Sequence, residues 1–296
     1  MSQADPVASI IIVSADSGAG LRECVARALA SSVPTEIILV DNASGDGIPR
    51  ELAREYASDP RVRVMFNDAN LGFGPAVNRG ARLASADALL ILNPDCMLEP
   101  NTIERLREIA LSHPHAGVIG AVVCDANGEP DPASRRRDPL LRRSLMSLSG
   151  LAKREALGPG YAGINVPGPM PDEVIEAENV SGALMLVARE AFERLGGFDE
   201  SYFLHCEDLD LCRRARDAGF KVLLAGNVRV LHGKGGSSRH RPVFVSRHKH
   251  RGMWRWFRKF DPAARNPLTC ALVWCGIWLH YVLTAPRLAI RKRQRV

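Results

Sequence analysis

The hydrophobic residues in the first half of the chain follow two alternating patterns. Short apolar runs, typical of buried strands, are each followed by a segment with apolar residues three or four positions apart, which is typical of an amphipathic helix. Strands and helices that alternate at this spacing predict right-handed βαβ units, so we expect an α/β fold with a mostly parallel sheet. The predicted strands are 8–14, 36–41, 61–67, 88–93 and 117–123, and the predicted helices are 20–31, 48–58, 74–85 and 101–112.

The regular pattern stops after residue 124. Residues 125–177 contain many Pro, Gly and Arg residues. A loop of this length is typical of a lid, a binding loop or a disordered segment, so we expect it to be flexible. Beyond it, the pattern predicts a strand pair or a strand and turn at 178–190, a helix at 191–196, a helix from Glu207 to Ala218 that Gly219 ends, and short strands at 221–226 and 228–233.

The net charge of +6 conceals an asymmetry between the two ends of the chain. Residues 229–296 contain sixteen Lys and Arg residues and one acid, Asp261, whereas residues 1–228 contain 23 basic and 32 acidic residues. A basic segment of this kind suits anionic lipid head groups, phosphates or nucleic acid. It also contains several aromatic residues, which are Trp254, Trp256, Phe257, Phe260, Trp274, Trp278 and Tyr281.

Within this basic segment, residues 267–286 are apolar, and only His280 has an ordinary pKa near neutral pH. The length suits a membrane-spanning helix, but a buried helix and a dimerisation helix fit as well. Because basic residues flank both ends, a helix lying in the plane of the membrane satisfies the positive-inside tendency better than a spanning one. We therefore expect residues 261–296 to form a helical extension that attaches the protein to the inner face of the cytoplasmic membrane.

Two features bear on the compartment. The N-terminus has no basic region before its apolar run, so it does not predict a signal peptide. The seven cysteines are odd in number and have no C-x-x-C spacing. This usage indicates a reducing compartment and neither a disulfide framework nor a cysteine zinc site. We expect a cytoplasmic protein.

Polar side chains follow three of the predicted strands. Because the carboxyl ends of parallel strands lie at one edge of a sheet, these side chains are expected to converge on one crevice. Each acid alone has the ordinary interpretation of a turn or cap, but converging acids repel one another unless a cation or hydrogen-bond donors lie between them. The groups are Ser14 with Asp16, Asp41 with Asn42, and Asn93 with Asp95.

Three further features are weaker alone. The loop 67–80 contains Asn70 and several glycines before a helix, but it has neither P-loop nor dinucleotide-binding spacing. Glu207 and Asp208 open a helix beside apolar and aromatic residues, so they are either helix-capping acids or a general base in a partly dry pocket. His232 ends a strand close to Lys234, where it is either structural or a ligand for a metal or phosphate.

Seven motifs in order resemble one family. They are "SIIIVSADSG", "EIILVDNASGD", "NLGFGPAVNRG", "LLILNPDC", "VSGALMLVARE", "GGFDESYFLHCEDLDLCRRARDAGF" and "VLHGKGGSS". Together they resemble the family 2 glycosyltransferases of the GT-A fold, in particular the bacterial rhamnosyltransferase-like enzymes, over about residues 8–260. The resemblance implies a GT-A domain over 1–260, in which the loop 125–177 lies on the acceptor side.

The resemblance also implies an inverting transfer of a sugar, with rhamnose suggested by the subgroup, from a dTDP- or UDP-linked donor to a saccharide acceptor, expected to be lipid-linked. It implies Mg²⁺ or Mn²⁺ held by Asp95 and His232, and Asp208 as the general base with Glu207 beside it. The donor-binding residues it implies are Ser14, Asp16, Asp41, Asn70, Asn78, Asn93 and Asp95. The acceptor-side residues it implies are Ser181, Gly182 and Ala183.

The chain departs from the family pattern at Ala15-Asp16, where members often have Tyr-Asn, and this affects the base and ribose contacts at that strand end. Two other classes of function fit the sequence less well. A sugar nucleotidyltransferase normally has a basic glycine-rich loop near its first strand, and residues 14–20 contain no Lys or Arg. A nucleic-acid-binding protein would use the basic segment, but that segment contains no recognised nucleic-acid module. We expect no nucleic-acid partner.

Overall fold

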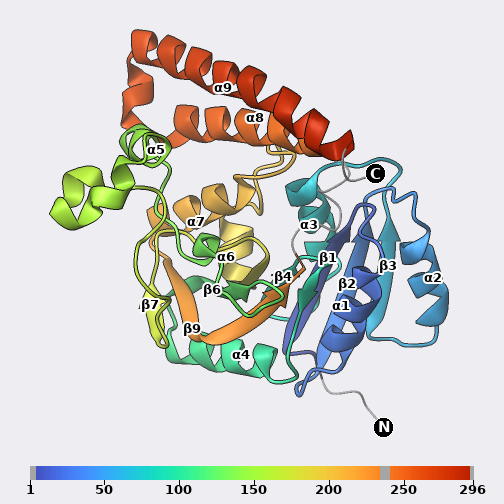
Figure 1. Ribbon diagram of the computed structural model, residues 1–296. Helices are drawn as coiled ribbons and strands as arrows, with labels where there is room; N and C mark the ends of the chain where they lie inside the picture. Colours follow the sequence, from blue (N-terminus) through green and yellow to red (C-terminus); the bar gives the residue numbers. More distant parts are fainter. Residues whose placement is uncertain (1–4, 234–240, 294–296) are drawn as a thin grey trace.

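A computed structural model describes residues 5–233 and 241–293 of the chain (Figure 1). Its strands form one sheet in the order β3-β2-β1-β4-β8-β6-β9-β5, with β7 paired to β9. The strands are β1 (Ala8–Ser14), β2 (Thr35–Asp41), β3 (Val62–Phe66), β4 (Ala88–Leu92), β5 (Cys96–Met97), β6 (Ala116–Cys124), β7 (Val174–Glu176), β8 (Leu184–Ala188) and β9 (Lys221–His232). The α-helices are α1 (Gly20–Leu29), α2 (Ile48–Glu55), α3 (Phe73–Ala81), α4 (Thr102–Ser112), α5 (Leu141–Leu148), α6 (Arg189–Arg194), α7 (Glu207–Asp217), α8 (Pro242–Phe260) and α9 (Pro267–Arg293).

The parallel half of the sheet confirms the predicted βαβ units. β1 pairs in parallel with β2 and with β4, and β2 pairs in parallel with β3. These strands are joined by α1, α2 and α3, as the hydrophobic pattern predicts. The register sets Ser14 opposite Asp41, so the last residues of β1 and β2 lie side by side at the same edge.

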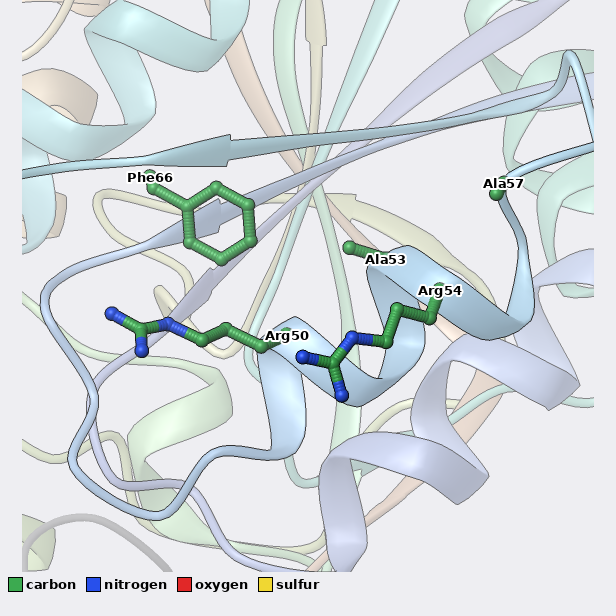
Figure 2. A pocket seen from close by; sticks show the side chains of 5 residues that line it. All are labelled: Arg50, Ala53, Arg54, Ala57 and Phe66. Carbon is green, nitrogen blue, oxygen red and sulfur yellow. The ribbon is translucent and has the colours of Figure 1, made fainter.

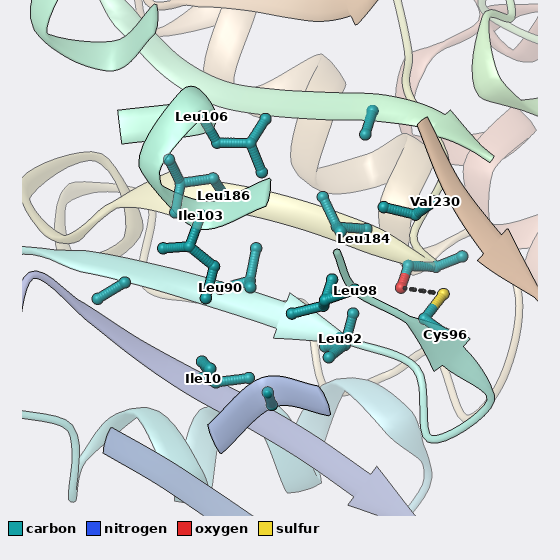
Figure 3. Packing of buried hydrophobic residues seen from close by; sticks show 14 of the residues in the cluster. Ile10, Leu90, Leu92, Cys96, Leu98, Ile103, Leu106, Leu184, Leu186 and Val230 are labelled. Carbon is teal, nitrogen blue, oxygen red and sulfur yellow. Dashed lines mark hydrogen bonds between the residues drawn. The ribbon is translucent and has the colours of Figure 1, made fainter. Parts of the chain in front are cut away.

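Helices cover both faces of the sheet, and this explains the continuous apolar runs of its strands. On one face, Ile10 and Leu90 lie in a buried cluster with residues of α1 and α4. Figure 3 shows part of this cluster, in which Ile103 and Leu106 of α4 lie over strand residues. The alternate strand residues, such as Ile11, belong to a second cluster with α3, α6 and α7.

The second half of the sheet confirms one predicted alternative and differs from the prediction in one place. Residues 178–190 contain a turn and one strand, β8, rather than a strand pair. β8 is antiparallel to both β4 and β6, and α6 follows it directly. The two short strands predicted near 221–233 are a single strand, β9. Its register with β6 shifts between Ala121 and Val122 of β6. In the shifted stretch, the amide of Gly226 donates to the carbonyl of Glu173.

The segment 125–177 contains short helices and one short strand. Besides α5 and β7, it forms 3₁₀ turns at Pro132–Ser134, Leu151–Leu157 and Pro159–Tyr161. Arg136 pairs with Asn179 through two backbone hydrogen bonds, and the buried carboxylate of Asp138 accepts from Arg213 and Arg216 of α7. This segment is therefore fastened to the body of the protein next to α7. Its predicted flexibility stays a prediction.

The two C-terminal helices pack side by side, with α8 between α9 and the rest of the protein (Figure 1). Trp256 of α8 is buried against Tyr202 and Leu209. Gly252 allows α8 to lie against the turn that precedes α7, because a Cβ there would come within 2.7 Å of the His205 carbonyl oxygen. α8 ends at Phe260, directly before the predicted extension begins.

Candidate functional site

The polar ends of β1 and β2 meet as the sequence predicts. The Ser14 hydroxyl donates to Ser17 at 3.1 Å and lies 3.4 Å from the Ser44 hydroxyl. The Asp41 carboxylate accepts from the backbone amide of Ser44 at 3.0 Å. Ser14 and Asp41 are both buried. Ser44, which sequence reasoning missed, therefore joins the two strand ends, and its place two residues after the "VDN" motif was the signal available.

Asp16 belongs to the same cluster. Its backbone adopts the left-handed region, with φ of 55°, and its amide donates to the Ser44 hydroxyl at 3.1 Å. Its carboxylate accepts from the amide of Gly45 at 2.7 Å. Residues with unfavourable backbone angles concentrate at functional sites, where the surrounding structure holds them in place. The loops after β1 and β2 thus form one connected group of oxygen atoms.

The glycine loop lies beside this group. Asn42, at the end of β2, donates to the carbonyl of Gly72 at 2.9 Å, and the Asn70 side chain accepts from the amide of Gly72 at 3.0 Å. Gly72 has φ of 93°, and a Cβ there would lie 2.5 Å from the Phe203 carbonyl oxygen. Glycine is therefore required at 72, where two segments far apart in sequence come together.

Asn78, on α3, is buried and its amide is already engaged. It donates to the Phe198 carbonyl and to the Glu200 carboxylate, at 2.9 and 3.0 Å, and accepts from the Phe198 amide at 2.8 Å. These bonds fasten α3 to the turn at 197–200. The structure thus places Asn78 as a support for the glycine loop, and its predicted contact with the donor stays a prediction.

The third strand end brings the predicted metal ligands together. His232 Nε2 lies 2.9 Å from Asp95 Oδ1 and 3.3 Å from Asn93 Nδ2. β5 pairs with β9 so that Cys96 faces His232, and the Gly233 amide donates to the Asp95 carbonyl at 2.9 Å. The two-residue strand β5 is thus what carries Asp95 to a histidine 137 positions later. Lys234 and the rest of the loop 234–240 lie outside the described residues.

The chemistry of this pair fits a hard divalent cation. Carboxylate oxygens are preferred by Mg²⁺ and Mn²⁺, and imidazole is an accepted ligand for Mn²⁺. Two cysteines lie nearby, but burial, followed by the charge of Asp95, raises the pKa of Cys24 to about 12, so it stays a neutral thiol. In the described part of the chain, no group of three His, Cys, Asp or Glu side chains is placed to hold a metal. The cation would thus need oxygen ligands from a phosphate-bearing substrate or from water.

Asp208 lies at the start of α7 and is held on three sides. Its Oδ2 accepts from Arg136 Nη2 at 2.6 Å and from the Gly182 amide at 3.2 Å, and its Oδ1 accepts from the Leu209 amide at 2.9 Å. The turn before it contains two successive left-handed residues, His205 and Cys206. Arg136 was missed by sequence reasoning because it lies in a segment without any periodic pattern.

Glu207 lies beside Asp208 and is 7 % exposed. Its Oε2 has no hydrogen-bond partner among the described residues. Burial, and then the negative charge of Asp208, raise the pKa of Glu207 to about 8. Glu207 is therefore a neutral carboxylic acid at pH 7, whereas the Asp208 carboxylate is paired with a guanidinium.

Residues 181–183 connect the two halves of the site. The Ala183 carbonyl accepts from the amide of Asn93 at 2.9 Å, and the Gly182 amide donates to Asp208. A Cβ at Gly182 would lie 3.0 Å from the Asp208 Cβ, so the chain passes close to this acid. The side chain of Ser181 turns back to accept from the Ala183 amide at 3.3 Å. One short segment thus links the end of β4 to the start of α7.

A surface depression lies on another part of the molecule. It is lined by Phe66 at the end of β3 and by Arg50, Ala53, Arg54 and Ala57 on or next to α2. Figure 2 shows these side chains, and none of the predicted site residues is among them. With two arginines and no carboxylate in its lining, it does not change the assignment of the site to the strand ends.

Comparisons with known proteins agree with this geometry. Residues 9–166 match the family described as glycosyl transferase family 2. This chain belongs to that family. The N-acetylglucosaminyl-diphospho-decaprenol L-rhamnosyltransferase of Mycobacterium tuberculosis is 31% identical over 88% of this chain and 92% of its own. Rhamnosyltransferase WbbL of Escherichia coli is 28% identical over 51% of this chain and 54% of its own. The family 2 member described here is therefore a glycosyltransferase of the rhamnosyltransferase-like type.

Solved structures confirm the GT-A fold. The mannosyltransferase PcManGT of Pyrobaculum calidifontis, solved with GDP-Man and Mn²⁺, superposes with a TM-score of 0.60 at 16% identity, covering 96% of this chain and 73% of its own. GalNAc-T7, solved with UDP, GalNAc and Mn²⁺, has a TM-score of 0.62 at 18% identity over 91% of this chain and 52% of its own. Both neighbours were solved with Mn²⁺.

Proposed function

We propose that this glycosyltransferase is inverting and metal-dependent, and that it transfers rhamnose from a nucleoside-diphosphate sugar to a lipid-linked saccharide used in cell-surface polysaccharide synthesis. The observation that carries the proposal is the connection of the Asp95–His232 pair to Asp208 through residues 181–183. In an inverting transfer, the diphosphate leaves and the hydroxyl attacks on opposite sides of one sugar carbon. Residues 181–183 join the Asp95–His232 pair, which suits the leaving diphosphate, to Asp208, which suits the attacking hydroxyl.

The donor side of the proposal uses the strand ends. Ser14, Asp16 and Asp41 offer oxygen acceptors to the base and ribose N–H and O–H groups of a nucleotide, and Asn70 shapes the loop beside them. Asp95 and His232 would hold Mg²⁺ or Mn²⁺, with Asn93 beside His232. When bound, such a cation neutralises charge on the departing diphosphate.

The acceptor side of the proposal uses Asp208. A sugar hydroxyl is a poor nucleophile until a base takes its proton. We assign that role to the Asp208 carboxylate, with residues 181–183 lining the acceptor. The acceptor oxygen bonds to the anomeric carbon as the bond to the diphosphate oxygen breaks, and the electron pair of that bond leaves with the diphosphate. A single displacement of this kind inverts the anomeric carbon and needs no covalent enzyme intermediate.

The name of the Mycobacterium tuberculosis relative supports the acceptor class, because that protein is named for an acceptor in which N-acetylglucosamine is linked by a diphosphate to decaprenol. Several neighbours were solved with UDP or GDP-linked sugars. For this chain we propose a dTDP- or UDP-linked donor.

The experiment that tests the donor site is titration calorimetry with dTDP and UDP, each with and without Mn²⁺. The proteins are the wild type, Asp95→Ala and a control, Asp172→Ala, whose carboxylate is 91% exposed on the loop before β7. We expect binding of one nucleotide that requires Mn²⁺, is lost in Asp95→Ala and is kept in Asp172→Ala. Equal binding by Asp95→Ala and wild type would contradict the metal assignment.

We also propose that α9 rests on an anionic membrane surface. Residues 267–288 are long and apolar enough to span a membrane, and only 6% of the most hydrophobic stretch is buried. The outer face of α9 carries a stripe of apolar residues spaced by about one or two turns, and each residue is at least 60% exposed. Its members are Leu268, Leu272, Leu279, Val282 and Leu283.

The opposite face of α9 is already covered. Cys270 is buried against the preceding turn and α8, and His280 Nδ1 lies 2.9 Å from Nε2 of the buried His250 on α8. Because one face is held by α8 and the other is apolar, an in-plane position buries the stripe without pulling α9 from the protein. Arg265 and Arg287 lie beyond the two ends of the stripe, and the chain has no acid after Asp261, which suits anionic head groups.

A further inference from the structure

We infer that Arg136 is a positioning residue for the transfer reaction: it holds the Asp208 carboxylate so that one oxygen, Oδ1, faces the acceptor. This inference rests on the proposed role of Asp208 as the base. It assigns a function to the irregular segment 125–177, which otherwise contributes no residue to the chemistry.

The contacts of Asp208 determine which of its oxygens is available. A carboxylate oxygen has two lone pairs. Oδ2 accepts from Arg136 Nη2 at 2.6 Å and from the Gly182 amide at 3.2 Å, so both of its lone pairs are engaged. Within the described part of the chain, Oδ1 accepts only from the Leu209 amide, at 2.9 Å. The remaining lone pair, on Oδ1, is the one that can take a proton from an acceptor hydroxyl.

The ion pair lies largely out of solvent. The side chains of Arg136 and Asp208 are 21% and 14% exposed. Burial by itself lowers the pKa of Arg136, but the charge and hydrogen bond of Asp208 outweigh it, so the pKa of the guanidinium lies above its usual value. Arg136 therefore stays cationic, and the interaction is screened less than an ion pair on the surface.

The backbone around Arg136 fixes its position. Its amide donates to the Asn179 carbonyl at 3.1 Å, and its carbonyl accepts from the Asn179 amide at 3.0 Å. Two residues later, Asp138 accepts from the Asn179 side chain at 3.0 Å and from two arginines of α7. Arg136 is thus held between the strand region that leads to Gly182 and the helix that carries Asp208. A guanidinium carried on a backbone fixed in this way can orient a carboxylate rather than merely neutralise it.

The chain offers a matched control in the next residue. Arg137 forms an ion pair of the same kind with Glu155, at 2.5 Å, and the two side chains are 19% and 18% exposed. This pair lies within the segment 125–177 and touches no residue assigned to the donor or the acceptor. Its loss tests whether any buried ion pair of this segment is needed for activity.

The experiment measures transfer from dTDP-rhamnose to a short-chain polyprenyl-diphospho-N-acetylglucosamine, with kcat and the acceptor KM determined separately. The variants are Asp208→Asn, Arg136→Met, Arg136→Lys and Arg137→Met. We expect Asp208→Asn to be inactive and Arg136→Met to lose about 10²-fold in kcat with an unchanged acceptor KM, because misplacing a reacting group costs about that much. Arg136→Lys should recover part of the loss, and Arg137→Met should equal wild type.

Each of the following results would overturn the inference. Equal kcat losses in Arg136→Met and Arg137→Met would show that Arg136 acts in folding alone. The same conclusion would follow if Arg136→Met did not fold and Arg136→Lys were fully active. A raised acceptor KM with unchanged kcat would make Arg136 an acceptor-binding group instead. An active Asp208→Asn, or an inactive wild type, would refute the proposed function itself, and the positioning role would fail with it.

Discussion

Replacing Glu207 by Gln is expected to stabilise the protein, and to do so increasingly as the pH rises. The residue is 7% exposed, and its Oε2 has no partner in the described part of the chain. Burial first, and the neighbouring charge of Asp208 second, raise its pKa from 4.5 to about 8. Gln keeps the shape of the protonated acid and removes the ionisation.

The sign follows from the two protonation states. Below pH 4.5 the carboxyl is neutral in both the folded and the unfolded chain, so it adds no pH dependence. Between pH 4.5 and about 8 the unfolded chain releases the proton while the folded protein keeps it, so stability falls as the pH rises. Each pH unit in this window costs about 1.4 kcal/mol of stability, so above it the complete loss amounts to at most about 5 kcal/mol.

A second effect acts in the opposite direction. Glu207 is the first residue of α7, where the helix dipole favours a negative charge. The helix dipole stabilises a charge by at most about 2 kcal/mol in partly buried positions. The cost of burying the charge of Glu207 is therefore the larger effect. The net gain expected for Glu207→Gln at pH 8.5 is a few kcal/mol, and the gain should vanish at pH 4.5.

The assay is urea unfolding of wild type and Glu207→Gln at a series of pH values from 4.5 to 8.5. Glu190→Gln is the control, because Glu190 also lies in the first turn of a helix, α6, but is exposed. The control should change stability by less than about 0.5 kcal/mol at each pH. If the curves of wild type and Glu207→Gln run parallel, Glu207 is ionised in the folded protein and the reasoning is wrong.

Two further predictions concern other parts of the molecule. Asn78→Ala should lower the free energy of unfolding in urea by about 1–3 kcal/mol, because it leaves the buried Phe198 amide and carbonyl unpaired. The control Asn101→Ala, on the surface, should lower it little. Equal losses in the two variants would contradict the role of Asn78. The double variant Leu272→Glu, Leu279→Glu should lose flotation with anionic liposomes. Leu111→Glu, which replaces an exposed leucine on α4, should float like the wild type. Flotation of the wild type and of both variants would refute the membrane role of α9.

The parallel half of the fold was predictable because its signal is local and repeated. The strands β1, β2 and β4 each contain a continuous apolar run, β3 is apolar except for Arg63, and each helix between them has the spacing of an amphipathic helix. The errors fall where long-range pairing decides the structure. A two-residue strand such as β5 carries no pattern of its own, and the single strand β9 looks like two because Gly226 and Asn227 interrupt its apolar run.

The site divides in the same way. The positions of Asp41 and Asp95 were predictable because a polar residue at or just after the end of a buried strand must lie at the edge of the sheet. Arg136 was not, because nothing in a segment rich in Pro, Gly and Arg distinguishes it from Arg135 or Arg137. Its role depends on Asp208, 72 positions later, and the two are brought together by the backbone pairing of Arg136 with Asn179. A local sequence pattern predicts where a residue lies within its helix or strand. The orientation of a carboxylate depends instead on the residues that contact it, which come from distant parts of the chain.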